Sequence, residues 1–345
     1  MNSIPIPLKI ITAFIAMTMA LETDLIYCQD QEIYLHETMD TSYRIMWVGQ
    51  YPDDDGEPLK RNFKDRLELV ITGSSGASKL SKPVTLCVLN DGSWWVLDQA
   101  TQSIVRVEKQ VGDIPHFKNS KDLFFPSLVG ICKFSDNRML ITDSFLNKIF
   151  VLSPDKKEIK ELNDSLKLDQ PTGIAYNPHN KEVWVVETRS HRISILDENG
   201  QFIRHFGQRG TAPGEFNFPT SIWIDDSGTI FIVDAMNFRI QIFSSDGEFI
   251  SVFGEIGDAT GYFARPKGIA TDTFGHIYIA DALYHVVQVF NVKGQYLYSF
   301  GNQGREKGEF WMPGGIYIDN DNNIYVADTY NSRIQVFKLI LGGSQ

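Results

Sequence analysis

Short runs of alternating apolar and polar residues fill most of the chain, and the sharpest of them occurs six times. The last copy, IYVADTYNSRIQVF, begins at Ile324, and the earlier copies begin at Trp94, Met139, Val183, Ile230 and Ile277. In each copy an acidic residue ends the first apolar run, and successive acidic residues lie 44 to 47 positions apart. The six are Asp98, Asp143, Glu187, Asp234, Asp281 and Asp328. A period in this range is typical of repeat architectures, so the C-terminal motif is one copy of six.

The copy from Phe218 to Gly257 shows what one repeat contains. It holds four short runs with strand character, SIWID, TIFIVD, RIQIFSS and EFISVFG, separated by the turn sequences DDSG, DAMN and SSDG. Alternation and β-branched or aromatic residues favour strands, and no helical period of similar strength is present. Four antiparallel strands per repeat, six times over, predict an all-β, six-bladed β-propeller.

Residues that recur inside the copies resemble the NHL repeat, whose pattern reads P-x-G-I-x-x-D, then G-x-I-Y-V-A-D-x-x-N-x-R-I-Q-V-F. The resemblance covers about residues 80–338, and the first two copies depart from it: Gln99–Ser103 lacks the Asn and Arg, and Lys148 replaces the Arg. The prolines that open copies are Pro171, Pro219, Pro266 and Pro313, and the glycines that close the preceding copies are Gly207, Gly254 and Gly301. We place six blades in residues 80–340.

An acidic residue and an arginine face each other across a turn in three copies, as in Asp328 and Arg333. Their spacing predicts a charge-assisted hydrogen bond that fixes the turn. Because the pair recurs once per repeat, we interpret it as structural and expect it to stabilise by about 1 kcal/mol where it is half-exposed.

The sixth copy has three strands, so a fourth must come from elsewhere to avoid an open sheet edge. Two segments before residue 80 qualify, YRIMWVGQY (43–51) and RLELVITGSSG (66–76). We favour 43–50 as the closing strand, because 62–71 has a helical stripe and resembles the helical plug of exported bacterial propellers. Residues 29–79 then hold the closing strand, a polar linker and a short helix.

The first 28 residues predict a signal peptide or a membrane-proximal segment. The apolar run from Ile10 to Leu21 is short for a membrane span and suits a signal-peptide core, with cleavage after Ala20 or a lipid attached at Cys28. We therefore expect an exported protein, in the periplasm, cell envelope or medium, which the intact mass of the mature protein checks. Membrane contact is expected only through such an N-terminal anchor.

The net charge limits the class of partner to expect, and the cysteine positions bear on whether a disulfide forms. The formal net charge of −11 argues against nucleic acid, whose binding depends on Lys and Arg. Cys87 and Cys132 occupy equivalent places in neighbouring copies, and we favour small buried side chains over a disulfide.

Enzyme chemistry is the alternative function. Some NHL-like propellers are peptidyl-hydroxyglycine lyases, and that resemblance implies a metal held by histidines just after the opening prolines. The corresponding residues are Val84, Thr172, Thr220, Lys267 and Gly314. None can hold a metal in that way, so we expect no cofactor and no catalytic residue, although Tyr330 resembles the tyrosine of the lyase turn.

Other titratable residues offer weak candidates. His191 and His285 lie in equivalent turns, where a structural role is favoured over a shared metal. A channel calcium ion needs converging carboxylates, and the acidic residues available lie in hairpins, where Asp serves turns. They are Asp225, Asp226, Asp272, Asp319 and Asp321.

A binding module is the favoured function, with a metal-dependent lyase or hydrolase in the channel as the alternative. We expect a protein or small-molecule ligand at one mouth of the propeller, bound by a monomer or by a component of an envelope complex. Arg265 and Lys267 favour an anionic ligand. The candidate binding residues are Thr172, Phe218, Thr220, Arg265, Lys267, Tyr284, Trp311 and Tyr330, and secondary candidates are Phe125, Phe238 and Met312.

Overall fold

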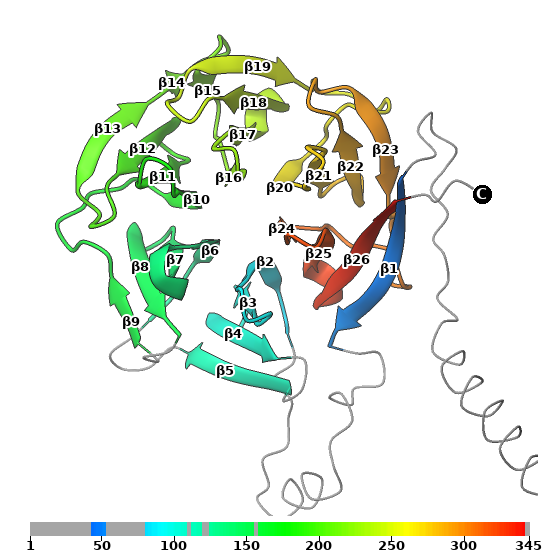
Figure 1. The fold of residues 1–345 in the computed structure, drawn as a ribbon, viewed down its shortest axis with the longest axis horizontal. Coiled ribbons are helices and arrows are strands. Elements are labelled where there is room, and N and C mark those ends of the chain that lie inside the picture. Colours follow the sequence, from blue (N-terminus) through cyan, green and yellow to red (C-terminus); the bar gives the residue numbers. More distant parts are fainter. Residues whose placement is uncertain (1–42, 53–79, 109–111, 119–123, 155–157, 342–345) are drawn as a thin grey trace, which may run out of the picture. The chain divides into compact units, whose positions relative to one another are not determined.

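Six four-stranded antiparallel sheets are arranged as blades around a central channel (Figure 1). The computed structural model describes residues 43–52, 80–108, 112–118, 124–154 and 158–341. The proposed signal segment, the helix proposed at 62–71 and the alternative closing strand at 66–76 lie outside these residues.

In blades 1 to 5 the strands follow chain order from the channel outward. Blade 1 contains β2 (Pro83–Val88), β3 (Trp94–Asp98), β4 (Ser103–Glu108) and β5 (Gly112–Lys118). Blade 2 contains β6 (Leu128–Lys133), β7 (Met139–Asp143), β8 (Lys148–Ser153) and β9 (Glu158–Glu161). Blade 3 contains β10 (Pro171–Asn177), β11 (Glu182–Glu187), β12 (Arg192–Leu196) and β13 (Phe202–Phe206).

The remaining blades follow the same plan, and blade 6 takes its outermost strand from the start of the chain. Blade 4 contains β16 (Ser221–Ile224), β17 (Ile230–Asp234), β18 (Arg239–Phe243) and β19 (Phe249–Phe253). Blade 5 contains β20 (Pro266–Thr271), β21 (Ile277–Asp281), β22 (Val286–Phe290) and β23 (Tyr296–Phe300). Blade 6 contains β24 (Ile316–Ile318), β25 (Asn323–Asp328), β26 (Arg333–Leu341) and β1 (Tyr43–Tyr51).

A few short elements complete the fold. The strands β14 (Gln208–Arg209) and β15 (Glu215–Phe216) pair in parallel between blades 3 and 4. Single 3₁₀ turns span Ser135–Asn137, Ala235–Asn237 and Thr329–Asn331. No helix in the described part of the chain has the length and apolar character needed to span a membrane.

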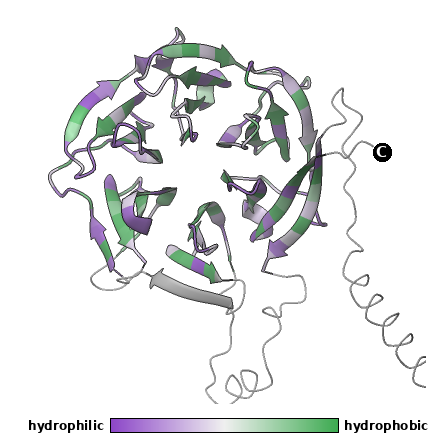
Figure 2. Cartoon of the chain, viewed as in Figure 1, coloured by the Kyte–Doolittle hydropathy of each residue, from purple (hydrophilic) through white to green (hydrophobic). Residues whose placement is uncertain are grey.

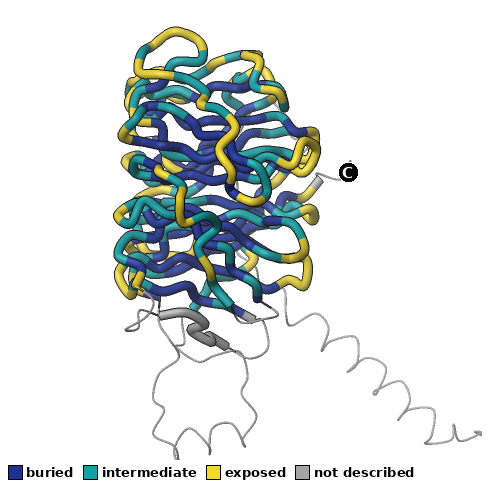
Figure 3. The backbone as a smooth tube through the Cα atoms, turned by 90° about the vertical axis from the view of Figure 1, so that its left-hand side faces the viewer, coloured by how far each residue is buried: buried dark blue, intermediate teal, exposed yellow. Residues whose placement is uncertain are grey.

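The second strand of each blade lies between neighbouring blades and is apolar on both faces. Every residue of β7, β17 and β21 is buried. Apolar positions therefore concentrate in the strands, and polar positions at the turns (Figure 2). Seen from the side, the buried residues occupy the middle of the blades, and most exposed residues lie at the turns on the two faces (Figure 3).

β1 closes the ring, as the sequence favours for residues 43–50. It pairs antiparallel with β26, from Tyr43 opposite Leu341 to Tyr51 opposite Ile334. Trp47 Nε1 donates a 2.9 Å hydrogen bond to Gln335 Oε1, which joins the two strands through side chains as well.

The glycines that end the repeats allow a phenylalanine to pack beneath the loop between blades. A Cβ on Gly301 would lie 2.3 Å from the ring of Phe310, and the glycine has a φ of +86°. Phe310 is fully buried, and Phe125, proposed from the sequence as a mouth residue, is fully buried at the equivalent place in blade 2. The proposal for Phe125 is wrong because the residue three positions before each opening proline, or before Leu128 in blade 2, is buried in the core.

Both described cysteines, Cys87 and Cys132, are free, as favoured from their spacing. Burial raises the pKa of the Cys87 thiol to about 12, so this side chain behaves as a small apolar group.

Candidate functional site: the channel mouth

The acidic residue of each repeat holds the loop that joins its blade to the preceding one. In all six blades its carboxylate accepts backbone N–H groups from that loop. The pairs are Asp98 with Ser81 and Lys82, Asp143 with Ser127, Glu187 with Asp169, Asp234 with Asn217, Asp281 with Ala264 and Arg265, and Asp328 with Trp311. The repeat motif therefore fixes the backbone at Lys82 and Arg265.

Three blades add an arginine to this carboxylate. Arg333 Nε lies 2.8 Å from Asp328 Oδ2, which also accepts hydrogen bonds from Asn331 and Gln335. The predicted bond is present, and because Asp328 is fully buried and the Arg333 side chain is 7% exposed, the value expected for a half-exposed pair does not apply to it. In blade 2, Lys148 stands in the place of the arginine, and it forms an ion pair with Glu161 and not with the acidic residue of the repeat, Asp143.

The channel contains a cavity of about 710 Å³. At one end it is lined by the first residues of the innermost strands and by the loops before them. The lining includes the positions that the lyase resemblance pointed to, together with their blade 2 equivalent: Val84, Val129, Thr172, Thr220, Lys267 and Gly314. Of the candidate binding residues, the cavity brings together Thr172, Thr220, Arg265, Lys267 and Tyr330.

Three cations meet at this end of the channel, which we call the basic mouth: Lys82 from blade 1, and Arg265 and Lys267 from blade 5. Water reaches Lys267, yet channel walls surround it, and this burial together with Arg265 and Lys82 lowers the pKa of its amine. None of the ion pairs among described residues involves these three cations.

Lys82 was not predicted from the sequence, although it stands immediately before Pro83 as Arg265 stands before Pro266. Its Nζ lies 5.8 Å from the ring centroid of Tyr330, whose side chain is half exposed. Lys82 could have been found from its position before the proline, which matches that of Arg265. It was missed because the first repeat departs from the NHL pattern.

Hydroxyl side chains line the wall across from the cations. Thr172 Oγ1 lies 2.7 Å from Thr188 Oγ1, and Thr188 Oγ1 donates a 2.7 Å hydrogen bond to the carbonyl of Pro219. The hydroxyls of Ser127 and Ser144, from blade 2, lie 2.8 Å apart. All four side chains belong to the cavity lining.

Aromatic side chains lie deeper in the channel. Trp223 of blade 4 and Tyr317 of blade 6 contact each other edge to face, with ring centroids 5.6 Å apart. Trp223 Nε1 donates a 2.9 Å hydrogen bond to Thr271 Oγ1, which fixes the indole. The rings provide an apolar surface below the basic mouth.

The three remaining binding candidates lie outside the cavity lining. Trp311 lies in the loop before β24, with the guanidinium of Arg305 5.0 Å from its ring centroid. Phe218 is 40% exposed, and its ring packs on His191. Tyr284, proposed as an exposed aromatic residue, is only partly exposed, because its hydroxyl donates to the carbonyl of Gly257.

The exposed apolar side chain of these turns lies two positions after the acidic residue. Tyr330 occupies this position, as the sequence predicted, and so do Phe145, Met236 and Leu283, whereas Phe238 and Tyr284 are only partly exposed. In blades 4 and 6, Asn237 and Asn331 donate to loop carbonyls as Tyr284 does in blade 5. The local turn, not side-chain polarity, decides which position faces solvent.

His191 and His285 join adjacent blades. The Nδ1 atom of His191 accepts the backbone N–H of Phe218 at 3.0 Å, and that of His285 accepts the N–H of Met312 at 2.9 Å. Asn147 does the same in blade 2, since its Oδ1 accepts the N–H of Gln170 at 2.9 Å. These contacts agree with the structural role favoured for both histidines.

The carboxylates of Asp225, Asp272 and Asp319 serve turns, as expected from their sequences, whereas Asp226 belongs to the cavity lining. Asp319 accepts four hydrogen bonds, two of them from the backbone of Asp321 and Asn323, and Asp272 accepts four in the equivalent hairpin. Among the residues that the structure describes, no three His, Cys, Asp or Glu side chains gather to hold a metal ion.

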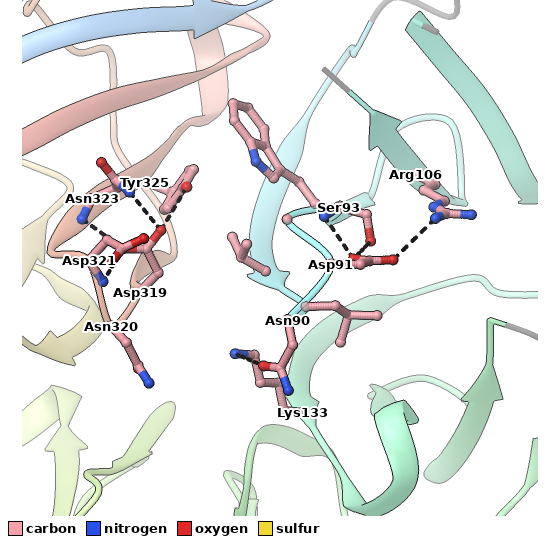
Figure 4. Close-up of a pocket in the computed structure, with 14 residues that line it drawn as sticks. Asn90, Asp91, Ser93, Arg106, Lys133, Asp319, Asn320, Asp321, Asn323 and Tyr325 are labelled. Carbon is pink, nitrogen blue, oxygen red and sulfur yellow. Dashed lines mark hydrogen bonds and ion pairs between the residues drawn. The ribbon is translucent and has the colours of Figure 1, made fainter. Parts of the chain in front are cut away.

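A second pocket, of about 700 Å³, lies between blades 1 and 6 at the hairpin ends of their strands (Figure 4). Figure 4 shows Asp91 of the β2–β3 hairpin with Ser93 and with Arg106 of β4, and Asp319 of the β24–β25 hairpin with Asn323 and Tyr325. The carboxylates of Asp91 and Asp319 are engaged within their own blades, and the pocket lining also includes Asp321.

Comparisons with known families agree with the fold. A family described as a 6-bladed beta-propeller matches residues 161–252, and the NHL repeat matches residues 310–337. The chain is a six-bladed NHL-repeat β-propeller. No curated protein matches its sequence.

Solved structures share the propeller fold at low sequence identity. The virginiamycin B lyase of Staphylococcus aureus is 17% identical, with a TM-score of 0.55, and the match covers 76% of this chain and 98% of the lyase. An auxiliary nutrient binding protein of Bacteroides thetaiotaomicron is 14% identical, with a TM-score of 0.61, covering 76% and 70%. A gluconolactonase of Xanthomonas campestris is 12% identical, with a TM-score of 0.59, covering 76% and 87%. At these identities the likeness extends to the fold alone.

Proposed function

We propose that this propeller is a binding protein that holds an anionic group of its ligand at the basic mouth. The observation that carries the proposal is the convergence of Lys82, Arg265 and Lys267 at one end of the channel in a protein of net charge −11. Their amine and guanidinium groups have no carboxylate partner among the described residues, so a bound anion would supply one.

The fold favours binding at this position by fixing the loops in advance. Asp98 holds the backbone N–H of Lys82, and Asp281 holds that of Arg265. The chain beside both cations is therefore ordered before a ligand arrives, which lowers the entropy cost of binding. Because Lys267 is partly desolvated, its attraction to an anion is screened less than that of a surface lysine.

The competing function is an enzyme, since a lyase and a gluconolactonase share the fold. The described lining of the channel includes one carboxylate, Asp226, and no histidine. General acid–base chemistry needs a group with a pKa near the working pH, and the basic mouth offers Lys267, whose pKa is lowered, with no described carboxylate or histidine of the lining at that end. This supports binding over catalysis.

Isothermal titration calorimetry at low ionic strength tests the proposal, with citrate and pyrophosphate as probes. We expect the triple variant Lys82→Ala, Arg265→Ala, Lys267→Ala to bind at least tenfold more weakly than the wild type. The control Lys160→Ala, Lys167→Ala, Lys293→Ala makes the same charge change away from the channel and is expected to bind as the wild type does. Equal weakening by both triple variants, or no binding by the wild type, would overturn the proposal.

A further inference from the structure

The wall of the basic mouth is divided into a charged half and a hydroxyl-bearing half. Lys82, Arg265 and Lys267 come from blades 1 and 5. The lining at this end from blades 2 to 4 has no charged side chain among the described residues and carries hydroxyl and amide groups instead. These groups belong to Ser127, Ser144, Gln170, Thr172, Thr188 and Thr220. A ligand that fills the cavity therefore meets cations on one side and neutral hydrogen-bonding groups on the other.

The direction of the hydrogen bonds leaves a free acceptor in this wall. Thr188 must donate its hydroxyl proton to the Pro219 carbonyl, because a carbonyl can only accept. Thr172 must then donate to Thr188 across their 2.7 Å contact. The Thr172 oxygen keeps its lone pairs for an incoming O–H or N–H donor.

Thr220 adds a second unused group. Its Oγ1 is buried and has no hydrogen-bond partner among the described residues, and its side chain belongs to the cavity lining. A buried hydroxyl without a partner costs free energy, and a ligand hydroxyl in hydrogen-bonding reach would remove that cost.

The deeper surface fits a saturated ring. The edge-to-face pair of Trp223 and Tyr317 lies below the polar wall, and the faces of aromatic rings pack well against C–H groups. A cavity of about 710 Å³ has room for a single six-membered ring with its substituents.

From this arrangement we infer that the ligand is a hydroxyl-rich anion built on a sugar-like ring, such as a sugar acid or a sugar phosphate. The acidic group meets Lys82, Arg265 and Lys267, and the ring hydroxyls meet Thr172 and Thr220. The inference rests on the proposed anion-binding function and adds the class of ligand.

Matched pairs of small anions test the class. Glucuronate is compared with cyclohexanecarboxylate, and glucose 1-phosphate with cyclohexyl phosphate, so that each pair keeps the charge, the ring size and the attachment of the acidic group and differs in the hydroxyl groups and the ring oxygen. Methyl glucoside supplies the hydroxyls without the charge. By calorimetry we expect the wild type to prefer the hydroxylated member of at least one pair by tenfold or more, and to bind methyl glucoside weakly. The pair that shows the preference distinguishes a carboxylate from a phosphate.

Two variants test whether the preference for hydroxylated anions depends on Thr172 and Thr220. Thr172→Val keeps the side-chain shape and leaves the Thr188–Pro219 bond in place, and Thr220→Val removes the unused hydroxyl. We expect each to lower the preference at least threefold while the plain anion binds unchanged. Thr211→Val, in an exposed loop, is the control and keeps the preference.

The outcomes separate this inference from the proposed function. Equal binding of both members of each pair by the wild type would overturn the inference and leave anion binding standing. Binding of neither member would overturn both. A preference that survives in both wall variants would also overturn the inference, because the hydroxyls would then lie elsewhere.

Discussion

Blades 5 and 6 carry the same turn with the same buried aspartate, but they provide for its charge differently. In blade 6, Asp328 accepts hydrogen bonds from Arg333, Asn331 and Gln335 besides a backbone N–H. In blade 5, the residue aligned with Arg333 is Val286. The carboxylate of Asp281 there accepts only backbone N–H groups in the described contacts, from Ala264, Arg265, Leu283 and Tyr284. Burial raises the pKa of both carboxyls.

The difference separates two tasks that the repeat sequence combines. The acidic residue orders the loop between blades, and it does so with or without an arginine. The arginine extends the reach of the turn: Arg333 donates to the carbonyls of Glu306 and Glu309 and to Gln50 of the closing strand. In blade 6 the arginine therefore joins the turn to β1, the strand that closes the ring. In blade 5 the aspartate alone fixes the backbone of the loop at Arg265, beside the basic mouth.

Removing the arginine should have the largest effect. Arg333→Ala leaves Asp328 buried without its cation and removes the bond to Gln50, so we expect a loss of about 3–5 kcal/mol in the free energy of unfolding. Urea unfolding measures it. Arg189→Ala breaks the exposed pair with Asp169 and should cost less than about 1 kcal/mol. A cost for Arg333→Ala as small as for the control would mean that the buried pair adds nothing.

Neutralising the two aspartates should distinguish the blades. Asp328→Asn leaves Arg333 without a carboxylate and should cost about 3 kcal/mol. Asp281→Asn places an amide N–H₂ group against backbone N–H groups but leaves no buried cation without a partner. We therefore expect the free energy of unfolding to fall by about 1–2 kcal/mol. The same urea titrations give both values. Equal costs would refute the division of tasks, because the arginine would then be irrelevant to the charge of the turn.

The smallest effect concerns the histidine that joins blades 3 and 4. Burial, with a further contribution from Arg209, lowers the pKa of His191, although Asp234 opposes the shift. The unfolded chain therefore takes up the proton more readily, so this residue costs no stability above about pH 6.5 and lowers stability as the pH falls below that value.

His191→Asn supplies a test, because Asn147 makes the same contact in blade 2 without titrating. The variant should fold normally at pH 7.5 and lose less stability than the wild type between pH 7 and pH 5, as followed by thermal unfolding. His205, whose pKa burial also lowers, keeps part of the wild-type slope. An unchanged slope in the variant would show that the His191 contact does not depend on protonation.

Most of the fold could be predicted from the sequence, because each blade repeats its own turn and strand chemistry. The spacing of the acidic residues gave the blade count, and the three strands of the sixth copy called for a further strand such as Tyr43–Tyr51. The burial of Asp328 and Arg333 could not be predicted in the same way, because it depends on the loop from the preceding blade covering both side chains.

The site was only partly predictable. The residues just before and after the opening prolines placed Thr172, Thr220, Arg265 and Lys267 at the channel, since those positions repeat in every blade. Thr188 was missed because its approach to Thr172 follows from the pairing of two strands and not from a local motif. Tyr284 was misplaced because a carbonyl 27 residues away, that of Gly257, decides where its hydroxyl points.

The pairing of β1 with β26 also limits when the ring can close during synthesis of the chain. Trp47 and Gln335 are 288 residues apart in the chain, and Gln50 and Arg333 are 283 apart. On the ribosome the first strand of the propeller is made long before its partner exists, so it must remain unpaired while five blades are synthesised. Contacts between residues so distant in sequence form slowly. Pairing of β1 with β26 therefore cannot begin until the last strand of the propeller has been made.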